Sequence, residues 1–389
     1  MKVLSLFDGI SCGRLALERA GIPVEKYYAS EIDKYAIAVA QKNYPDTIQI
    51  GDVCKIDFTQ YIGKVDMIIG GSPCQDLSIA KQNRQGLHGE RSRLFWEYIK
   101  ALTIIKPKYF LLENVASMKN EDRDAITAVL RGIYPETECI MINSALVSAQ
   151  QRKRYYWTNW HVAQPQDKGI LLKDILEPHC DEKFLMTDKN IQHCCRSYGS
   201  KAQNITNAEK CPTLCAAMGC GGGNVPFMFV PVADREKSHA VISSVGRTTE
   251  QPERIGQLDG LGKGQENRIY SVRGKSVCLN ANGGGGGAKT GLYKVDLPDG
   301  DYIVRKLTPR ECERLQTLPD GWTEKGLIQW NYANVMDATL LEMDLSSLRM
   351  GSITEISNTN RYKAIGNGWT VDVIAHIFKQ IPTEQKDNK

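Results

Sequence analysis

The chain has 389 residues, enough for one large domain or two moderate ones with a full hydrophobic core. Its 24% charged and 42% hydrophobic residues are typical of a soluble globular protein. The net charge of +4 permits nucleic-acid binding only through local clustering of positive side chains. No apolar run approaches the roughly 20 residues that span a bilayer, so we expect no transmembrane segment, no signal peptide and a cytoplasmic protein.

Strands and helices alternate through the first 160 residues. Short apolar runs predict strands at Val3–Phe7, Tyr27–Ser30, Met67–Gly70, Tyr109–Leu112, Ile140–Asn143 and Tyr155–Thr158. Helical spacing of apolar residues predicts helices at Gly13–Ala20, Lys34–Tyr44, Leu94–Ile105 and Asp122–Ile133. This alternation predicts an α/β fold, Rossmann-like and doubly wound, with a mostly parallel sheet covered on both faces. Ligands bind such sheets at the carboxyl ends of the strands.

Glycine becomes dense after residue 160, and helical spacing fades. Two similar loop-forming segments, Pro212–Gly223 and Ser276–Gly287, indicate duplication of a small β-rich module. A flexible Gly-rich linker is the alternative, and it is weaker because apolar residues surround both segments.

Strand–helix alternation resumes at Val304 and ends in a helical pattern at Val371–Ile381. We therefore predict one catalytic α/β domain, residues 1–155 and 303–389. A smaller β-rich, Gly-rich domain at residues 156–302 would interrupt it.

Twelve cysteines without a C-x-x-C pair favour reduced thiols in a cytosol over a disulfide framework. A zinc site is the competing interpretation for six residues near the middle of the chain: His193, Cys194, Cys195, Cys211, Cys215 and Cys220. Zinc sites favour two-residue spacings between paired ligands. This group has none, so we predict no metal.

Three features at successive strand ends predict a nucleoside site. The glycine-containing turn Phe7–Gly13 follows the first strand and opens the first helix, where glycine allows the backbone to approach a ligand. Glu31 ends the second strand, where a carboxylate can hold ribose hydroxyls. Asp52 follows the next apolar stretch and could accept a hydrogen bond from an adenine amino group. Each feature alone is more often an ordinary turn, a helix cap or a solvated residue.

A second group of reactive and charged residues follows later strands of the predicted sheet. Cys74 follows the predicted strand Met67–Gly70 in G-G-S-P-C-Q-D, where glycine and proline place it on a sharp loop. Most single cysteines are instead small buried hydrophobes. Glu113 follows the apolar run at Tyr109–Leu112, and Gln150–Arg154 gathers three cations beside another strand. A basic cluster is usually a solvated face.

The order of these motifs is similar to that of the cytosine-C5 DNA methyltransferases. The motifs are F-D-G-I-x-x-G, S-E-I-D, G-D-V, G-G-S-P-C-Q-D-L-S, E-N-V, Q-x-R-x-R and G-N-G-x-x-V. The opening third resembles the animal de novo branch. Three later segments, Gly262–Tyr270, Ala288–Gly291 and Arg305–Cys312, resemble the bacterial HhaI-type enzymes. The resemblance extends from Val3 to about Phe378 and implies the S-adenosylmethionine-dependent methyltransferase fold.

The resemblance implies methyl transfer from S-adenosyl-L-methionine to C5 of a cytosine in double-stranded DNA, leaving S-adenosyl-L-homocysteine. Cys74 would attack C6 as a thiolate, and Glu113 would hold and protonate N3. Arg154 would contact the O2 edge, supported by Arg152, and the base would be flipped out of the duplex. The residues expected around the cofactor are Phe7, Gly9, Ile10, Gly13, Glu31, Ile32, Asp52, Val53, Pro73, Asn367 and Trp369.

The inserted domain would recognise the target sequence, with its Lys and Arg residues meeting phosphates. The expected DNA-binding residues of the whole chain are Ser78, Thr213, Gln265 and Arg268. Gln265 and Arg268 are the best base-contact candidates, since Arg can pair bidentately with guanine. We expect no obligatory protein partner; a cognate restriction endonuclease would act separately, in a prokaryotic or phage setting.

Three departures from the family pattern stand out. Cys12 occupies a position where many members carry glycine, and it would crowd the cofactor loop. Cys278 replaces an expected threonine, which weakens the case for a phosphate contact there. The segment Gly326–Ser352 is longer than the pattern predicts and has no assigned function.

Three other functions are less well supported. An RNA-directed relative is disfavoured by the long insert, and a catalytically inactive DNA-binding relative by the retention of Cys74, Glu113 and Arg154. A nicotinamide dehydrogenase would need a different glycine spacing and would leave Cys74 unexplained.

Overall fold

The structure is a computed structural model. It describes residues 1–72, 93–178, 181, 184, 304–329 and 351–382, together with six short strands between residues 203 and 294.

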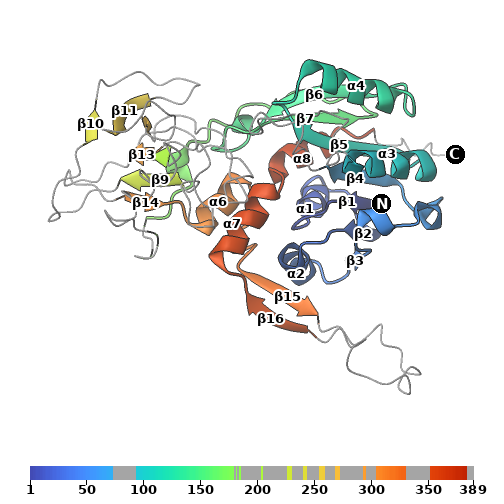
Figure 1. The fold of residues 1–389 in the computed structure, drawn as a ribbon, viewed down its shortest axis with the longest axis horizontal. Helices are drawn as coiled ribbons and strands as arrows, with labels where there is room; N and C mark the ends of the chain where they lie inside the picture. The colour runs from blue at the N-terminus through green and yellow to red at the C-terminus, as the bar shows by residue number, and fades with distance from the viewer. Residues whose placement is uncertain are drawn as a thin grey trace.

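A seven-stranded sheet forms the centre of the molecule, in the order β3-β2-β1-β4-β5-β7-β6 (Figure 1). Its strands are β1 (Lys2–Leu6), β2 (Lys26–Ser30), β3 (Ile48–Gln49), β4 (Met67–Gly71), β5 (Tyr109–Val115), β6 (Glu138–Asn143) and β7 (Lys153–Thr158). The pairs among β1 to β5 are parallel, and β7 is antiparallel to both of its neighbours. β7 runs backwards because the connection from β6 is too short for a crossover. The predicted doubly wound, mostly parallel sheet is confirmed.

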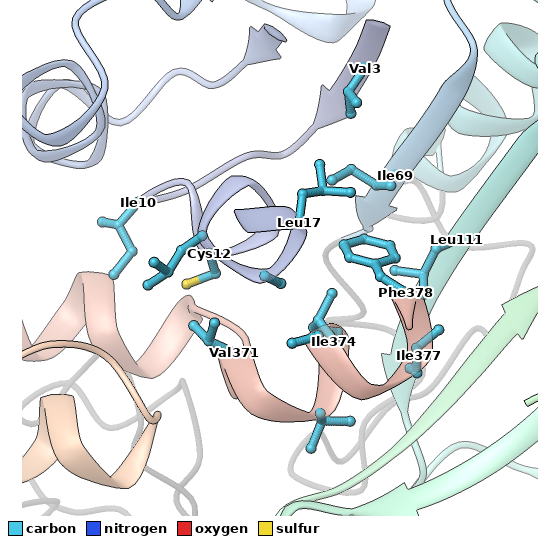
Figure 2. Packing of buried hydrophobic residues seen from close by; sticks show 14 of the residues in the cluster. Val3, Ile10, Cys12, Leu17, Ile69, Leu111, Val371, Ile374, Ile377 and Phe378 are labelled. Atoms are coloured by element: carbon cyan, nitrogen blue, oxygen red, sulfur yellow. The ribbon is translucent and has the colours of Figure 1, made fainter. Parts of the chain in front are cut away.

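Both faces of the sheet are buried, and successive residues of a strand face opposite cores. Val3 and Ile69 lie in one hydrophobic cluster, whereas Leu4 and Ile68 lie in the other. Helices α1 (Cys12–Arg19), α2 (Lys34–Asn43) and α8 (Val371–Phe378) contribute to the first cluster, and α3 (Arg93–Ile105) and α4 (Asn120–Arg131) to the second. Figure 2 shows the apolar faces of α1 and α8 packed against each other.

Two further helices connect the sheet to the rest of the chain, and the sequence analysis did not predict either. They are α6 (Pro309–Leu315) and α7 (Asn358–Asn367). A capping box begins α6: Thr308 Oγ1 accepts from the Glu311 amide, and the Glu311 carboxylate accepts from the Thr308 amide. The T-P-R-E sequence is the signal that could have located this helix.

The inserted region contributes seven short strands, gathered to one side of the α/β body (Figure 1). They are β8 (Gln203–Asn204), β9 (Pro226–Phe229), β10 (Ala240–Ile242), β11 (Arg254–Leu258), β12 (Arg268–Ser271), β13 (Leu292–Lys294) and β14 (Val304–Lys306). They form the sheets β10-β11-β12-β13 and β14-β9-β8.

Both predicted limits of the inserted domain lie close to strands of the structure. A boundary at residue 156 would cut β7, and both Trp160 and Val162 are buried in the first core cluster. Beyond the predicted limit at residue 302, β14 pairs with β9 of the inserted region.

Two antiparallel strands lie between α6 and α7: β15 (Lys325–Gln329) and β16 (Gly351–Glu355). They stand at the two ends of the long segment that the sequence pattern singled out. β15 packs on α2, where a Cβ on Gly326 would lie 2.8 Å from the Cβ of Ala38. Within the described ranges, no helix has the length and hydropathy needed to cross a membrane.

Candidate active site

The candidate site lies where the winding of the sheet reverses. β1 has β2 on one side and β4 on the other, and open α/β sheets bind ligands beyond the carboxyl ends of strands at such a point. Gly9 follows β1 and Glu31 follows β2, whereas Glu113 lies within β5, two residues before its end and not after it as the sequence pattern predicted.

The turn after β1 has an unusual backbone. Phe7, Gly9 and Ser11 have φ angles of 60°, 61° and 59°, a left-handed conformation that costs a non-glycine residue roughly 1–2 kcal/mol. The buried carboxylate of Asp8 stabilises this shape by accepting from Ser11 Oγ (2.6 Å) and from the Tyr27 hydroxyl (2.7 Å).

Burial raises the pKa of Asp8, against the opposing effect of hydrogen bonds from Ser11 and neighbouring hydroxyls. The nearby Glu31 carboxylate adds to the rise. The sequence places Asp8 in this turn, but no local pattern indicates that its side chain shapes the turn.

Glu31 is held in a fixed orientation by three backbone amides. Its Oε2 accepts from Gly9 (2.8 Å), and its Oε1 accepts from Ile32 (2.7 Å) and Asp33 (2.9 Å). An ionised carboxylate has about four lone-pair positions, so capacity remains for a ligand hydroxyl.

Two further predicted cofactor residues follow Glu31 in the sequence, Ile32 directly and Asp52 after β3. The Ile32 side chain is 76% exposed, an apolar surface in solvent directly beside the anchored Glu31. Asp52 ends the segment after β3 and accepts from the Cys54 amide (3.0 Å), which begins the short 3₁₀ helix Val53–Lys55.

Other predicted cofactor residues lie in different environments. Ile10 and Val53 are buried in the two core clusters, so their side chains support the turns rather than line a surface. Gly13 lies against the core, because a Cβ there would be 2.5 Å from Ile69 Cδ1. Phe7 is half-buried, and Asn367 is exposed at the end of α7.

Glu113 and Arg154 form a largely buried ion pair at the end of β5. Glu113 Oε1 lies 2.9 Å from Arg154 Nε, and the two side chains are 11% and 13% exposed. Arg154 enters from antiparallel β7, where it pairs with Val115, two residues beyond Glu113. Trp369 Nε1 donates to the other oxygen, Glu113 Oε2, at 3.3 Å.

The end of β4 adapts to this carboxylate. A Cβ on Gly71 would lie 2.7 Å from Glu113 Oε2 and 2.8 Å from Trp369 Nε1, so only glycine fits there. The next residue, Ser72, is buried and accepts from Asn114 Nδ2 at 3.5 Å. Cys74 follows Ser72 by two residues.

Arg152 supports the site rather than lining it. Its buried guanidinium donates from Nη2 to the Gly368 carbonyl (3.0 Å), which also accepts from Gln316 Nε2 (3.2 Å). Gln316 was not singled out from the sequence, yet it also accepts from Thr370 Oγ1 (2.8 Å).

Cys12 does not point toward the cofactor turn. Its side chain is 2% exposed, and Figure 2 shows its sulfur directed toward Val371. A Cβ on Gly368 would lie 3.1 Å from this sulfur. Burial raises the pKa of the Cys12 thiol to about 12, so the group remains a neutral part of the core.

Several predicted positions lie outside the described residues. They are Pro73, Cys74, Ser78, Thr213, Gln265, Cys278 and the six residues of the alternative zinc site. Arg268 begins β12, and only its backbone is described.

The fold is a doubly wound α/β sheet, with a tightly turned segment after β1 and a largely buried carboxylate–guanidinium pair near the end of β5. The profile of the family described as C-5 cytosine-specific DNA methylase matches residues 1–335. The chain therefore belongs to the C-5 cytosine-specific DNA methylases, and its class of enzyme is DNA cytosine-C5 methyltransferase.

Known proteins resemble the chain over most of its length. It is 25% identical to the orphan methyltransferase M.SPRI of Bacillus phage SPR, covering 98% of this chain and 97% of the relative. It is 28% identical to the type II methyltransferase M.HhaI of Haemophilus parahaemolyticus, covering 83% and 85%. The methyltransferase EhMeth of Entamoeba histolytica shares the fold, with a TM-score of 0.58 at 14% identity over 97% of this chain and 96% of that one.

Proposed function

We propose that the chain methylates C5 of a flipped cytosine in a specific double-stranded DNA sequence, using S-adenosyl-L-methionine and a covalent bond between Cys74 and C6. The observation that carries this proposal is the position of Glu113. Its carboxylate is held by Arg154 and Trp369 beside Gly71, and the chain continues from there through Ser72 to Cys74.

The proposed chemistry starts from the poor nucleophilicity of cytosine C5. The Cys74 thiolate adds to C6, forming a C–S bond, while Glu113 delivers a proton to N3; the resulting enamine is nucleophilic at C5. Arg154 both orients Glu113 and supplies positive charge at the O2 edge of the base. After methylation, loss of the C5 and N3 protons and expulsion of the thiolate restore the aromatic ring.

The residues around the β1 turn fit S-adenosyl-L-methionine. The anchored Glu31 carboxylate suits ribose hydroxyls, exposed Ile32 suits the face of a purine, and Asp52 suits an amino group. A Cβ at Gly9 would meet nothing within 4 Å, which leaves room for a ligand beside the backbone. When bound, this cofactor supplies an electrophilic methyl group.

Duplex DNA is the proposed substrate because the long inserted region, whose strands β8–β14 form two sheets to one side of the α/β body, is large enough to contact a duplex. The relatives M.SPRI, from a phage, and M.HhaI, from a bacterium, are both named as methyltransferases. A cognate restriction endonuclease would be a separate protein.

Bisulfite sequencing of plasmid and chromosomal DNA from cells that express the chain tests the proposal. We expect 5-methylcytosine at one short sequence motif, and none in cells that express Cys74→Ala. Purified protein should label duplex DNA but not transfer RNA from a methyl-labelled cofactor. Labelling of RNA alone, or of neither, would refute the assignment.

A further inference from the structure

The indole ring of Trp369 lies between the cofactor turn and the Glu113 carboxylate. A Cβ on Gly13 would lie 3.2 Å from Trp369 Cζ3, and a Cβ on Gly71 would lie 2.8 Å from Trp369 Nε1. Two glycines, one at the start of α1 and one at the end of β4, thus make room for the same ring.

This ring contacts Glu113 through a hydrogen bond. Trp369 Nε1 donates to Glu113 Oε2 at 3.3 Å, while Arg154 Nε lies 2.9 Å from Oε1. Because each carboxylate oxygen has a different partner on a different element, the plane of the carboxylate is fixed.

The backbone of Trp369 is itself held on both sides. The carbonyl of Gly368 accepts from Arg152 Nη2 (3.0 Å) and Gln316 Nε2 (3.2 Å). Thr370, on the other side, donates to Gln316 Oε1 (2.8 Å) and accepts from Ser144 Oγ (2.9 Å). A side chain on such a segment can impose an orientation on its partner.

We propose that Trp369 is a positioning residue for Glu113, and not only part of the cofactor wall that the family pattern implies. Its N–H holds the carboxylate toward the base, and its ring, in contact with α1, sets the distance between the cofactor turn and the acid. This proposal rests on the proposed role of Glu113 in protonating N3.

Replacement of Trp369 by phenylalanine keeps an aromatic ring and removes the N–H donor. We expect the single-turnover rate of methyl transfer to fall about tenfold, as for the loss of a hydrogen bond to a charged group. The KM for S-adenosyl-L-methionine should stay within about twofold. Benzothienylalanine at position 369 replaces only the indole N–H by sulfur and therefore keeps the volume of the ring. It should lower the methyl-transfer rate by a similar factor.

A matched control is Trp160→Phe. Trp160 is buried, whereas Trp369 is half-buried, and Trp160 Nε1 donates at 3.2 Å to the Ile377 carbonyl, away from Glu113. This variant should lose comparable stability and keep the methyl-transfer rate.

A double-mutant cycle with Glu113→Gln separates this proposal from the proposed function. If Trp369 acts through Glu113, the tenfold effect should largely disappear in the Glu113→Gln background. An unchanged rate in Glu113→Gln alone would refute the role of Glu113. The positioning role would be refuted, with the proposed function intact, if Glu113→Gln lowers the methyl-transfer rate but Trp369→Phe does not. The same holds if the effect of Trp369→Phe on the rate is strictly additive with that of Glu113→Gln, or if it changes only the KM.

Discussion

Asp8 shows how one buried carboxyl group shapes a binding turn. Its two oxygens accept from Ser11 and Tyr27, which join the turn after β1 to the neighbouring strand β2. The sequence F-D-G predicted the turn, because glycine and its place after an apolar strand are local signals. It did not predict the contact with Tyr27, which depends on the register between β1 and β2.

The raised pKa of Asp8 makes a prediction about stability and pH. The unfolded chain releases this proton near the ordinary value of 3.8, before the folded protein does. The unfolding free energy therefore decreases as pH rises from 3.8 through the raised folded-state pKa. Asp8→Asn removes this titration, so the variant should gain relative to wild type across that window and keep a constant difference above it.

Urea unfolding of both proteins over a pH series, without cofactor, measures this difference. Two stability curves that run parallel through the whole series would show that Asp8 does not titrate as described.

Cys74 is the residue with the sharpest chemical test. Wild-type protein should form a covalent adduct with duplex DNA that carries 5-fluorocytosine, because fluorine cannot leave as the C5 proton does. Cys74→Ala should form none, while Cys139→Ala, at a half-buried thiol on β6, should react like wild type. Denaturing electrophoresis detects the adduct, and its persistence in Cys74→Ala would move the nucleophile elsewhere.

At the scale of elements, α6 connects the inserted region with the catalytic layers. Thr308 Oγ1 caps α6 and also donates to the Glu177 carboxylate, which lies on the path into the insert. The Glu177 amide in turn donates to Glu311 Oε1 at 2.8 Å. The segments that enter and leave the insert are therefore tied to the same helix end.

We predict that Thr308→Ala lowers the unfolding free energy by about 1–2 kcal/mol, through loss of the cap and of the link to Glu177. Ser357→Ala is the control, since Ser357 caps α7 at an exposed site by accepting from Asn360 at 3.4 Å. Its effect should be smaller. Denaturant unfolding measures both, and equal losses would mean that the Glu177 contact contributes nothing.

The elements that sequence predicted well are those with strong local patterns. The predicted strand at Met67–Gly70 and helix at Lys34–Tyr44 agree with β4 and α2 to within one residue at each end. The active-site contacts are different in kind. Trp369 and Glu113 lie 256 positions apart, and no local pattern indicates that their side chains meet. The family resemblance implied that both residues belong to the site, but it did not predict the hydrogen bond between them.

At the scale of the whole molecule, we propose that the inserted region reads the DNA sequence while the α/β body carries out the chemistry. Arg268, at the start of β12, is our candidate for reading guanine. Arg268→Ala should cost about 1–3 kcal/mol at one base position and relax specificity there. Lys263→Ala, if this side chain meets only phosphate, should weaken binding to all sequences alike and flatten its salt dependence.

Methylation profiles over a randomised site library distinguish these effects. An Arg268→Ala enzyme that is slower but keeps the wild-type sequence preference would remove Arg268 from the base readers.

The packing of α1 against α8 has a consequence for the order in which the protein is made. Arg19 of α1 contacts Asp372 of α8 across 353 positions of sequence. All seven strands of the central sheet have been synthesised once the ribosome passes Thr158, but one face still lacks α8, which covers it together with α1 and α2. At roughly 5–20 residues per second, translation of the stretch before α8 takes on the order of ten seconds or more. During that interval the nascent chain exposes apolar surface and lacks Trp369. We therefore expect the protein to become able to methylate DNA only late in its synthesis. A truncated chain that ends within the inserted region should be bound by chaperones or degraded, and should have no partial activity.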